Sequence, residues 1–246
     1  MHPKRIHLVS VDSTNRYLSD LLKAGTTSEF TMVTADFQEN GRGQGDRDWN
    51  SQPGENLLKS VLLFPAFLSA SGQFHLSRIA SLAIVDLLKK LDLDPSIKWP
   101  NDILVNGKKI AGILIEHGIT GEKLSHTIIG TGLNLNQVQF SGFPVPATSL
   151  ALEGLPGQDP PEMAERLLMA LRARYSQLKS GLTGLLEDAY LDHLYLMDQP
   201  GDFTSGGVQF TGIIRGVDNT GQLMVERDGK TEAYAFQQIR YEMPNG

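Results

Sequence analysis

The sequence contains no cysteine among its 246 residues. Disulfides, thiolate metal sites and a cysteine nucleophile are therefore excluded. Positive charge is also scarce, because 22 lysines and arginines stand against 28 aspartates and glutamates, giving a net charge of −6. That balance argues against nucleic acid as the main partner, since neutralising phosphates requires a basic face. No apolar run approaches the roughly 18 residues of a membrane span, and the start lacks the apolar segment of a signal peptide. We expect a cytoplasmic protein with no membrane and no DNA partner.

Several motifs that would mark a nucleotide, metal or catalytic site are missing as well. The only Gly-Lys-Ser/Thr triplet is 229–231, and Met224 stands where a Walker loop needs its first glycine. No GxGxxG or GxSxG motif is present, and the six histidines have no HxxxH or HExxH spacing. The sequence therefore predicts no metal site built from protein ligands, and any nucleotide must be bound by other means.

Hydrophobic residues make up 40% and charged residues 20%, as in ordinary soluble globular proteins. Apolar periodicity predicts strands and helices in mixed order, which is typical of an α+β fold. Asn106-Gly107 lies between two apolar runs and predicts a hairpin with a type I′ turn. The expected strands are 6–11, 30–38, 56–64 and 125–137; the expected helices begin after Asp12 or Ser13, at 73–91, at 163–181 after Pro161, and at about 183–196, with a loop over 140–160.

The character of the chain changes after about residue 198. Short β-like runs alternate with turn sequences such as DNTG (218–221) and RDGK (227–230). Such a meander is too short for a second large domain and suits a small barrel. We therefore expect a larger α+β domain over 1–197 and a small β-barrel domain over 198–246.

The stretch GRGQGDRDWNS (41–51) is the first candidate binding segment. Its glycines allow the backbone to turn and to direct N–H groups at an anion. Arg42 and Arg47 supply forked cations that suit phosphate oxygens, and Trp49 offers a flat surface for a base. The alternative is a solvated glycine-rich loop with Trp49 in the core, and the residues of this stretch do not decide between the two.

The second candidate is KWPNDILVNGKK (98–109). Pro100 interrupts strand pairing, so the chain bends there and polar groups such as Asn101 and Asp102 are expected to face a cleft. Lys109 follows the turn and can reach back over the sheet. An ordinary hairpin with exposed lysines would explain Lys108 but leaves the Trp-Pro-Asn-Asp sequence unexplained.

The third candidate is GTGLNLN (130–136). Small residues there would let a ligand approach the backbone closely, with Asn134 and Asn136 as amide contacts. The alternative, a glycine-rich strand end with turn asparagines, stays open.

Taken together, these segments resemble the bacterial biotin–protein ligase family, and they occur in its order and spacing. The matching segments are DSTN (12–15), Gln38, GRGQ…W (41–49), KWPNDILV with KKIAGILIE (98–116), and GTGLNLN (130–136). The resemblance implies an α+β fold, a mixed β-sheet with helices on one side, followed by a small SH3-like β-barrel. It implies an enzyme that uses Mg-ATP to activate biotin to biotinyl-5′-AMP with release of pyrophosphate. Biotin then passes to one lysine of a biotin carboxyl carrier protein; no prosthetic group is implied.

Roles carried over by position divide the matched residues into two sets, with Lys109 and Arg42 as the expected catalytic residues. The biotin contacts implied are Ser13, Thr14, Asn15, Gln38, Arg42, Gly43, Gln44, Lys109 and Gly112. The nucleotide contacts implied are Arg42, Arg47, Trp49, Asn101, Lys109, Gly132 and Asn134.

The chain departs from the family in its glycine-rich loop, where Gln44 replaces a common arginine. Asp46 and Asp48 should weaken the local positive field, which favours Arg42 and Lys109 over Arg47 as phosphate contacts. Longer family members carry an N-terminal helix-turn-helix domain. Here DSTN begins at residue 12, so we expect a ligase without a DNA-binding domain.

Two other functions remain open at this level. A lipoate–protein ligase would share the catalytic architecture, although GRGQ and KWPND favour biotin. A non-catalytic module that sequesters a ligand is the other alternative. A homodimer formed through an exposed sheet edge is also possible.

Overall fold

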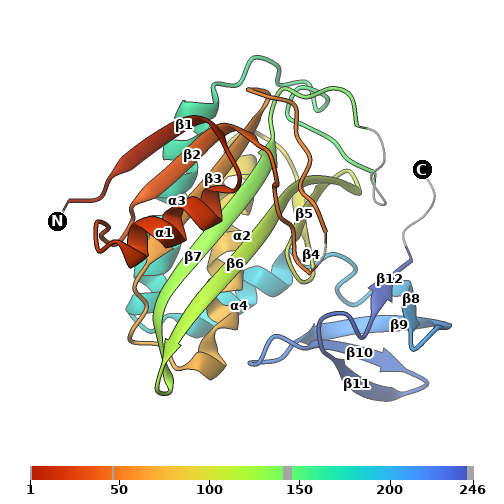
Figure 1. Cartoon of the computed structure of the whole chain (residues 1–246). Helices are drawn as coiled ribbons and strands as arrows, with labels where there is room; N and C mark the ends of the chain where they lie inside the picture. The colour runs from red at the N-terminus through yellow and green to blue at the C-terminus, as the bar shows by residue number, and fades with distance from the viewer. Residues whose placement is uncertain (1, 46, 141–145, 243–246) are drawn as a thin grey trace.

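A seven-stranded mixed sheet forms the frame of the larger part of the molecule (Figure 1). The structure is a computed structural model, and it describes residues 2–45, 47–140 and 146–242. The strand order is β1-β2-β3-β7-β6-β5-β4, with β1 and β2 parallel and the other neighbours antiparallel. The strands are β1 (Arg5–Val11), β2 (Met32–Gln38), β3 (Asn56–Leu63), β4 (Pro95–Lys98), β5 (Asp102–Val105), β6 (Lys108–Thr120) and β7 (Lys123–Asn134).

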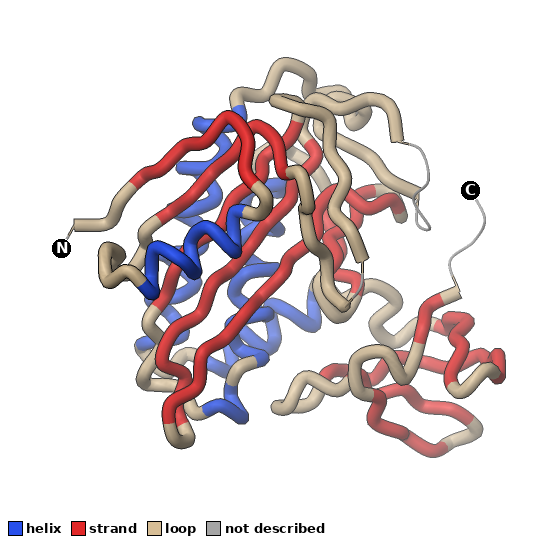
Figure 2. Tube along the Cα trace, viewed as in Figure 1, coloured by secondary structure: helices blue, strands red, loops and turns tan. Residues whose placement is uncertain are grey.

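Helices cover both faces of this sheet, unequally (Figures 1 and 2). They are α1 (Thr14–Lys23), α2 (Phe74–Lys89), α3 (Pro160–Lys179) and α4 (Thr183–Asp192), with a short 3₁₀ turn at Ala70–Gly72. Strand β3 shows the division, because successive side chains of a strand point to opposite faces. Val61 packs in the large core with α2 and α3, whereas Leu62 packs with Leu18 of α1. The predicted α+β class is confirmed, with α2, α3 and α4 together on one face and α1 on the other.

A second, smaller sheet follows the helices. Its strands are β8 (Pro200–Ser205), β9 (Val208–Val217), β10 (Leu223–Arg227), β11 (Lys230–Tyr234) and β12 (Arg240–Tyr241). All pairings are antiparallel, in the order β11-β10-β9-β8-β12. Within the described residues this is an open sheet rather than a closed barrel, and it is consistent with an SH3-like domain. The domain boundary at 197/198 stays a prediction.

The second sheet is attached to the first through the turn between β9 and β10. Arg78 of α2 is fully buried, and its Nη2 donates to the carbonyl oxygens of Val217 (3.3 Å) and Asp218 (3.4 Å). Trp99 Nε1 donates to the carbonyl oxygen of Gly221 at 2.9 Å. A Cβ at Gly221 would lie 2.6 Å from the Phe74 ring, so only glycine fits there. Two buried donors therefore fix the position of the turn.

Most predicted elements are found with shifted ends; a tertiary contact explains one of the shifts and a local helix cap explains another. The last helix ends at Asp192 rather than 196, because the carbonyl of His193 and the N–H of Tyr195 bond to Ile97 of β4. Helix α3 begins at Pro160 instead of after Pro161, with Asp159 accepting from Glu162 N as its cap. Part of the predicted 140–160 loop, residues 141–145, lies outside the described residues.

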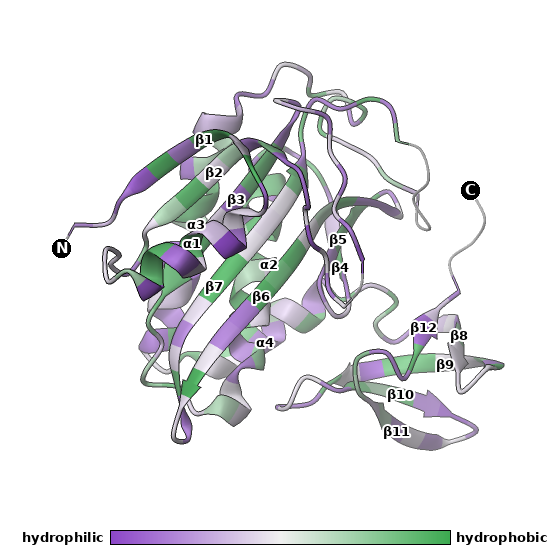
Figure 3. Ribbon diagram, in the orientation of Figure 1, coloured by the Kyte–Doolittle hydropathy of each residue, from purple (hydrophilic) through white to green (hydrophobic). Residues whose placement is uncertain are grey.

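The hairpin between β5 and β6 is confirmed in detail. Asn106 and Gly107 both have positive φ, 50° and 73°, as a type I′ turn requires. This turn sends β6 back along the centre of the sheet, where hydrophobic stretches of β6 and β7 alternate with pale and hydrophilic positions (Figure 3).

None of the described helices combines the length and the apolar character needed to cross a membrane.

Lys59 of β3 is a buried charged residue without a hydrogen-bond partner for its amine among the described residues. Its side chain is 2% exposed. Burial lowers the pKa of Lys59 to about 7, against the attraction of Glu165 on α3. The folded protein therefore gives up a proton that the unfolded chain retains.

We predict that Lys59→Met stabilises the protein at pH 7 by on the order of a few kcal/mol. The folded-state pKa is depressed, so between about pH 7 and pH 10.5 the unfolded chain binds more protons and stability rises with pH. The methionine variant should lack that slope and meet the wild type near the upper end of the window. Urea unfolding at pH 7, 8.5 and 10 measures this, with exposed Lys108→Met as the control. Parallel pH curves for wild type and Lys59→Met would contradict the prediction.

Candidate functional site

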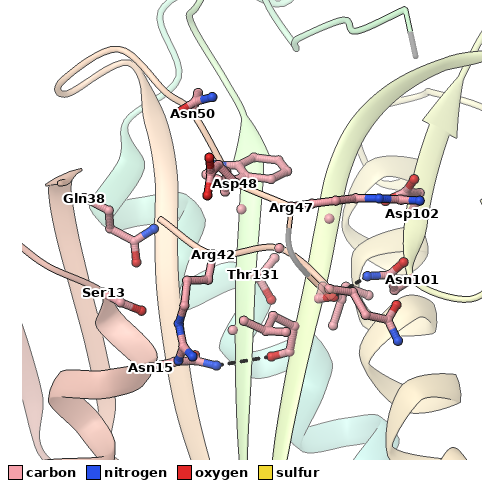
Figure 4. A pocket seen from close by; sticks show the side chains of 18 of the residues that line it. Ser13, Asn15, Gln38, Arg42, Arg47, Asp48, Asn50, Asn101, Asp102 and Thr131 are labelled. Carbon is pink, nitrogen blue, oxygen red and sulfur yellow. Dashed lines mark hydrogen bonds between the residues drawn. The ribbon is translucent and has the colours of Figure 1, made fainter. Parts of the chain in front are cut away.

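A cavity of about 300 Å³ opens on the α1 face of the large sheet (Figure 4). Its walls come from the start of α1, the end of β2, the 41–50 loop, the bend before β5, and the paired strands β6 and β7. Every residue to which the family resemblance gives a biotin or nucleotide contact lines this one cavity: Ser13, Thr14, Asn15, Gln38, Arg42, Gly43, Gln44, Arg47, Trp49, Asn101, Lys109, Gly112, Gly132 and Asn134. The structure brings the set together, while the role of each residue stays a prediction.

One corner of the cavity is a buried polar network at the start of α1. Gln38 Oε1 accepts from Thr14 N at 2.8 Å and from Thr14 Oγ1 at 2.9 Å. Ser60 Oγ lies 2.7 Å from Thr14 Oγ1 and 2.6 Å from Asn15 Oδ1. Ser13 occupies the predicted N-cap position, but its side chain makes no capping hydrogen bond. The side chain of Gln38 instead accepts a hydrogen bond from the N–H of Thr14. Gln38 and Ser13 are directed toward the cavity (Figure 4).

Glu116 of β6 joins this corner to the glycine-rich loop. Its Oε2 accepts from Asn15 Nδ2 at 2.7 Å, and its Oε1 accepts from Arg42 Nη2 at 3.0 Å. The Arg42 and Glu116 side chains are 41% and 40% exposed, so their ion pair is weak and can be broken at low cost. Gly130 makes room for this arrangement, because a Cβ there would lie 2.5 Å from Asn15 Oδ1.

A second group of charges lies at the opposite end of the cavity. Lys109 Nζ is 2.5 Å from Asp102 Oδ1, and Lys98 Nζ is 3.8 Å from Asp102 Oδ2. The register between β5 and β6 shifts after Ile103, and Lys109 pairs with Leu104 at that irregularity. Burial lowers the pKa of Lys98, against the attraction of Asp102. One buried carboxylate thus holds Lys109 in place beside the cavity.

Trp49 covers a floor made of glycines. A Cβ at Gly112 would lie 2.9 Å from its ring, and one at Gly132 would collide with the ring outright. The Trp49 Nε1 is buried and has no hydrogen-bond partner in the described part of the chain. Trp49 N donates to Gly41 O at 2.8 Å, which closes the loop into a small hairpin. The sequence left open whether Trp49 lies in the core or beside a ligand site. Trp49 is partly buried, and its ring lies against the glycine floor of the cavity rather than in the apolar core.

The two asparagines of the third segment have different surroundings. Asn134 is 5% exposed and lines the cavity, where its Nδ2 donates to Thr148 O at 2.9 Å. Asn136 does not line the cavity; its side chain bonds both the carbonyl (2.8 Å) and the N–H (2.9 Å) of Gln158. The hypothesis of Asn136 as a ligand contact is therefore wrong, because its amide is used to hold a loop. Asp46 of the first segment lies outside the described residues.

Three contributors to the site were missed or left without a role by sequence reasoning: Glu116, Ser60 and Asp102. Strand alternation could have found Glu116, since it shares a face of β6 with Gly112 and follows it by four residues. Ser60 is two residues from Leu62 on β3 and therefore shares the α1 face with it. Their partners could not be found, because Asn15 lies 101 positions from Glu116 and 45 from Ser60.

This chain is similar to known proteins in both sequence and fold. The model of the Biotin/lipoate A/B protein ligase family matches residues 8–134. The chain is 33% identical over 241 residues to the bifunctional ligase/repressor BirA of Bacillus spizizenii, a match that covers 93% of this chain and 72% of that protein. It is 30% identical over 226 residues to the biotin–[acetyl-CoA-carboxylase] ligase of Paracoccus denitrificans, covering 89% of this chain and 92% of that protein.

Among solved structures, the biotin protein ligase from Aquifex aeolicus in complex with biotin and ATP superposes with a TM-score of 0.81 over 98% of this chain and 100% of that chain. The two are 24% identical, so this likeness shows the fold. Because the family model covers more than half of the sequence and the relatives at 30% identity or above match over most of their length, the chain belongs to the biotin/lipoate A/B protein ligase family.

Proposed function

We propose that this chain is a biotin–protein ligase that forms biotinyl-5′-AMP from biotin and Mg-ATP and transfers biotin to a lysine of a biotin carboxyl carrier protein. One observation carries the proposal: residues from all five matched segments, each with an implied biotin or nucleotide role, line a single cavity. The curated relatives include biotin–[acetyl-CoA-carboxylase] ligases, which favours biotin over lipoate as the acid. A cytoplasmic location follows from the same assignment.

The polar corner suits the head of biotin. The ureido ring is neutral and both donates and accepts hydrogen bonds, so hydroxyl and amide groups can hold it without a charge. Ser13 and Gln38 are directed into the cavity, and Thr14 and Asn15 are fixed behind them by Ser60. A network that is already bonded loses little conformational entropy when the ligand binds.

The charged end suits the activation step. A carboxylate must attack the α-phosphorus of an anionic nucleotide, so like charges approach each other. Lys109, held by Asp102, places a cation beside the cavity, and Arg42 supplies another from the loop. Cations that are positioned before the reaction stabilise the developing charge most effectively. Here the bond between carboxylate oxygen and phosphorus forms and pyrophosphate leaves.

Magnesium enters this proposal with the nucleotide. No group of three or more histidine, aspartate or glutamate side chains in the described part of the chain is arranged to hold a metal ion. Asp48 and Asp102 are the carboxylates among the cavity-lining residues, which fits an ion that is held mainly by phosphate oxygens with one or two protein carboxylates. When bound, Mg²⁺ would neutralise charge on the phosphates.

The transfer step uses the neutral amine of the acceptor lysine. Its nitrogen attacks the acyl carbon of biotinyl-5′-AMP, the C–N bond forms, and the C–O bond to phosphate breaks. AMP leaves with the electron pair, and a proton from the amine is released to water. The edge strand β1 of the large sheet offers a surface for the homodimer that we include in the proposal.

Pyrophosphate release from Mg-ATP tests the activation step directly. We expect release that depends on biotin, with lipoate and no acid as parallel reactions. Release with lipoate and none with biotin would replace the proposal by a lipoate ligase, and no release with either acid would remove the enzyme assignment.

Lys109→Ala should lower the rate of adenylate formation by about 10²–10³-fold, since one charge-stabilising contact is lost. Biotin binding should change much less. Its neighbour Lys108→Ala is the matched control, because Lys108 is exposed and does not line the cavity. Rapid-quench measurement of biotinyl-5′-AMP on the enzyme separates the two effects. Equal rates for the two variants would refute the role assigned to Lys109.

Arg42→Ala should allow biotinyl-5′-AMP to leave the site early, because the loop loses its ion pair with Glu116 and its contact with the phosphate. Free adenylate acylates amines at random, so bystander proteins should become biotinylated. Streptavidin blots of a reaction containing serum albumin report this, with Arg166→Ala on α3 as a remote control. Retention of the intermediate by Arg42→Ala would count against this role.

A further inference from the structure

The main chain of Lys109 is held by a segment that is distant in the sequence. Strand β7 ends at Asn134, and its pairing with β6 does not extend to Lys109. Residues 146–148 lie beside Lys109 instead and form a short parallel bridge with it. Lys109 N donates to Pro146 O at 2.8 Å, and Thr148 N donates to Lys109 O at 2.9 Å. Both main-chain hydrogen-bonding groups of the predicted catalytic lysine therefore depend on where this segment lies.

The same segment is fastened to the end of β7. Asn134 Nδ2 donates to Thr148 O at 2.9 Å, and Leu150 N donates to Asn134 O at 3.2 Å. Thr148 is 1% exposed, and Leu150 is fully buried in the large core. Asn134 and Ala147 line the cavity. The segment thus joins two residues with implied nucleotide contacts, Asn134 and Lys109, to one rigid support.

The carboxylate of Glu153 connects this segment to the turn of the β5–β6 hairpin. Glu153 Oε1 accepts from Thr148 Oγ1 at 2.5 Å, and Glu153 Oε2 accepts from Asn106 Nδ2 at 2.7 Å. Glu153 N donates to Ser149 O at 3.0 Å, in a turn that brings the carboxylate back toward Thr148. Both side-chain partners are donors, so two acceptor oxygens are needed at this position, and a carboxylate supplies them.

Glu153 lies behind the cavity wall rather than in it. Neither Thr148 nor Glu153 is among the described residues that line the cavity, whereas Ala147 is. Glu153 therefore acts on the site only through the main chain that it ties together. Such an effect is large enough to measure, because a displacement of about 1 Å in a reacting group can lower a rate by about 10²-fold.

We propose that Glu153 is a positioning residue for the activation step. By joining Asn106 of the hairpin turn to Thr148, it fixes the main chain on both sides of Lys109 and so fixes where the lysine amine lies. The inference rests on the proposed ligase function and adds to it a residue outside the cavity.

Exchanging donor for acceptor between positions 106 and 153 tests this role. Glu153→Gln alone leaves Asn106 facing an amide N–H, and Asn106→Asp alone sets two carboxylates against each other. In the double variant the new amide can donate to the new carboxylate, while Thr148 keeps its acceptor. Aspartate is compatible with this turn, since Asp228 has a φ of 51°, close to the 50° of Asn106. Glu122→Gln is the matched control, because it removes one exposed carboxylate from the turn of another hairpin, β6–β7.

Two quantities are measured on protein that circular dichroism shows to be folded. One is single-turnover formation of biotinyl-5′-AMP as a function of biotin concentration at saturating Mg-ATP. The other is the hydrogen-exchange rate of the Lys109 and Thr148 N–H groups without substrates. We expect each single variant to form adenylate about 10-fold more slowly at saturating biotin, with the half-saturating biotin concentration unchanged and faster exchange at both groups. The double variant should return to within about twofold of the wild type in both, and the control should match the wild type.

The outcomes separate positioning from a purely structural role. Normal adenylate formation by the folded single variants would overturn the proposal, even if exchange became faster. A double variant that is as slow as the single variants would overturn it too, because the loss would not come from the bond between the two positions.

Thr148→Val covers the case in which a variant that alters charge does not fold. It removes the other bond to Glu153 and keeps the shape of the buried side chain. We expect the same slower adenylate formation and faster exchange, and a wild-type rate would overturn the proposal. Absence of adenylate in the wild type would instead reject the proposed ligase function, whereas the exchange rates would still show whether Glu153 holds the segment.

Discussion

The site depends on the absence of side chains where β6 and β7 pair in the middle of the large sheet. Gly112 lies opposite Gly132, and Gly130 lies opposite Leu114, so the α1 face has a bare backbone floor there. Trp49 rests on one part of that floor and Asn15 on another, both within distances that no Cβ would permit. A larger residue at these positions would displace the loop or the start of α1, and with it the cavity.

Two cations of the site, Lys109 and Arg42, are paired with carboxylates. Lys109 is bound by Asp102 and Arg42 by Glu116, although the two pairs differ in burial. Asp102 is almost buried, so Lys109 is held firmly, whereas the exposed pair at Arg42 is weak enough to exchange for a phosphate. A fixed cation and a releasable one suit a reaction in which one charge positions the substrates and the other closes over them.

The second sheet is more than an appendage to this arrangement. Arg78 and Trp99 donate hydrogen bonds to carbonyl groups at the turn between β9 and β10 and hold it against α2.

Local sequence patterns determined much of this protein. Alternating apolar residues defined most strands, and Asn106-Gly107 defined the hairpin. The motif segments supplied the residues with implied ligand contacts, and these residues line the cavity. Only the tertiary structure decided that α1 lies on the opposite face from α2, that Glu116 joins Asn15 to Arg42, and that His193 ends the last helix by pairing with Ile97. Periodicity and turn chemistry act over a few residues, whereas these contacts arise when whole elements pack, and no local pattern encodes which distant partner will fill the space.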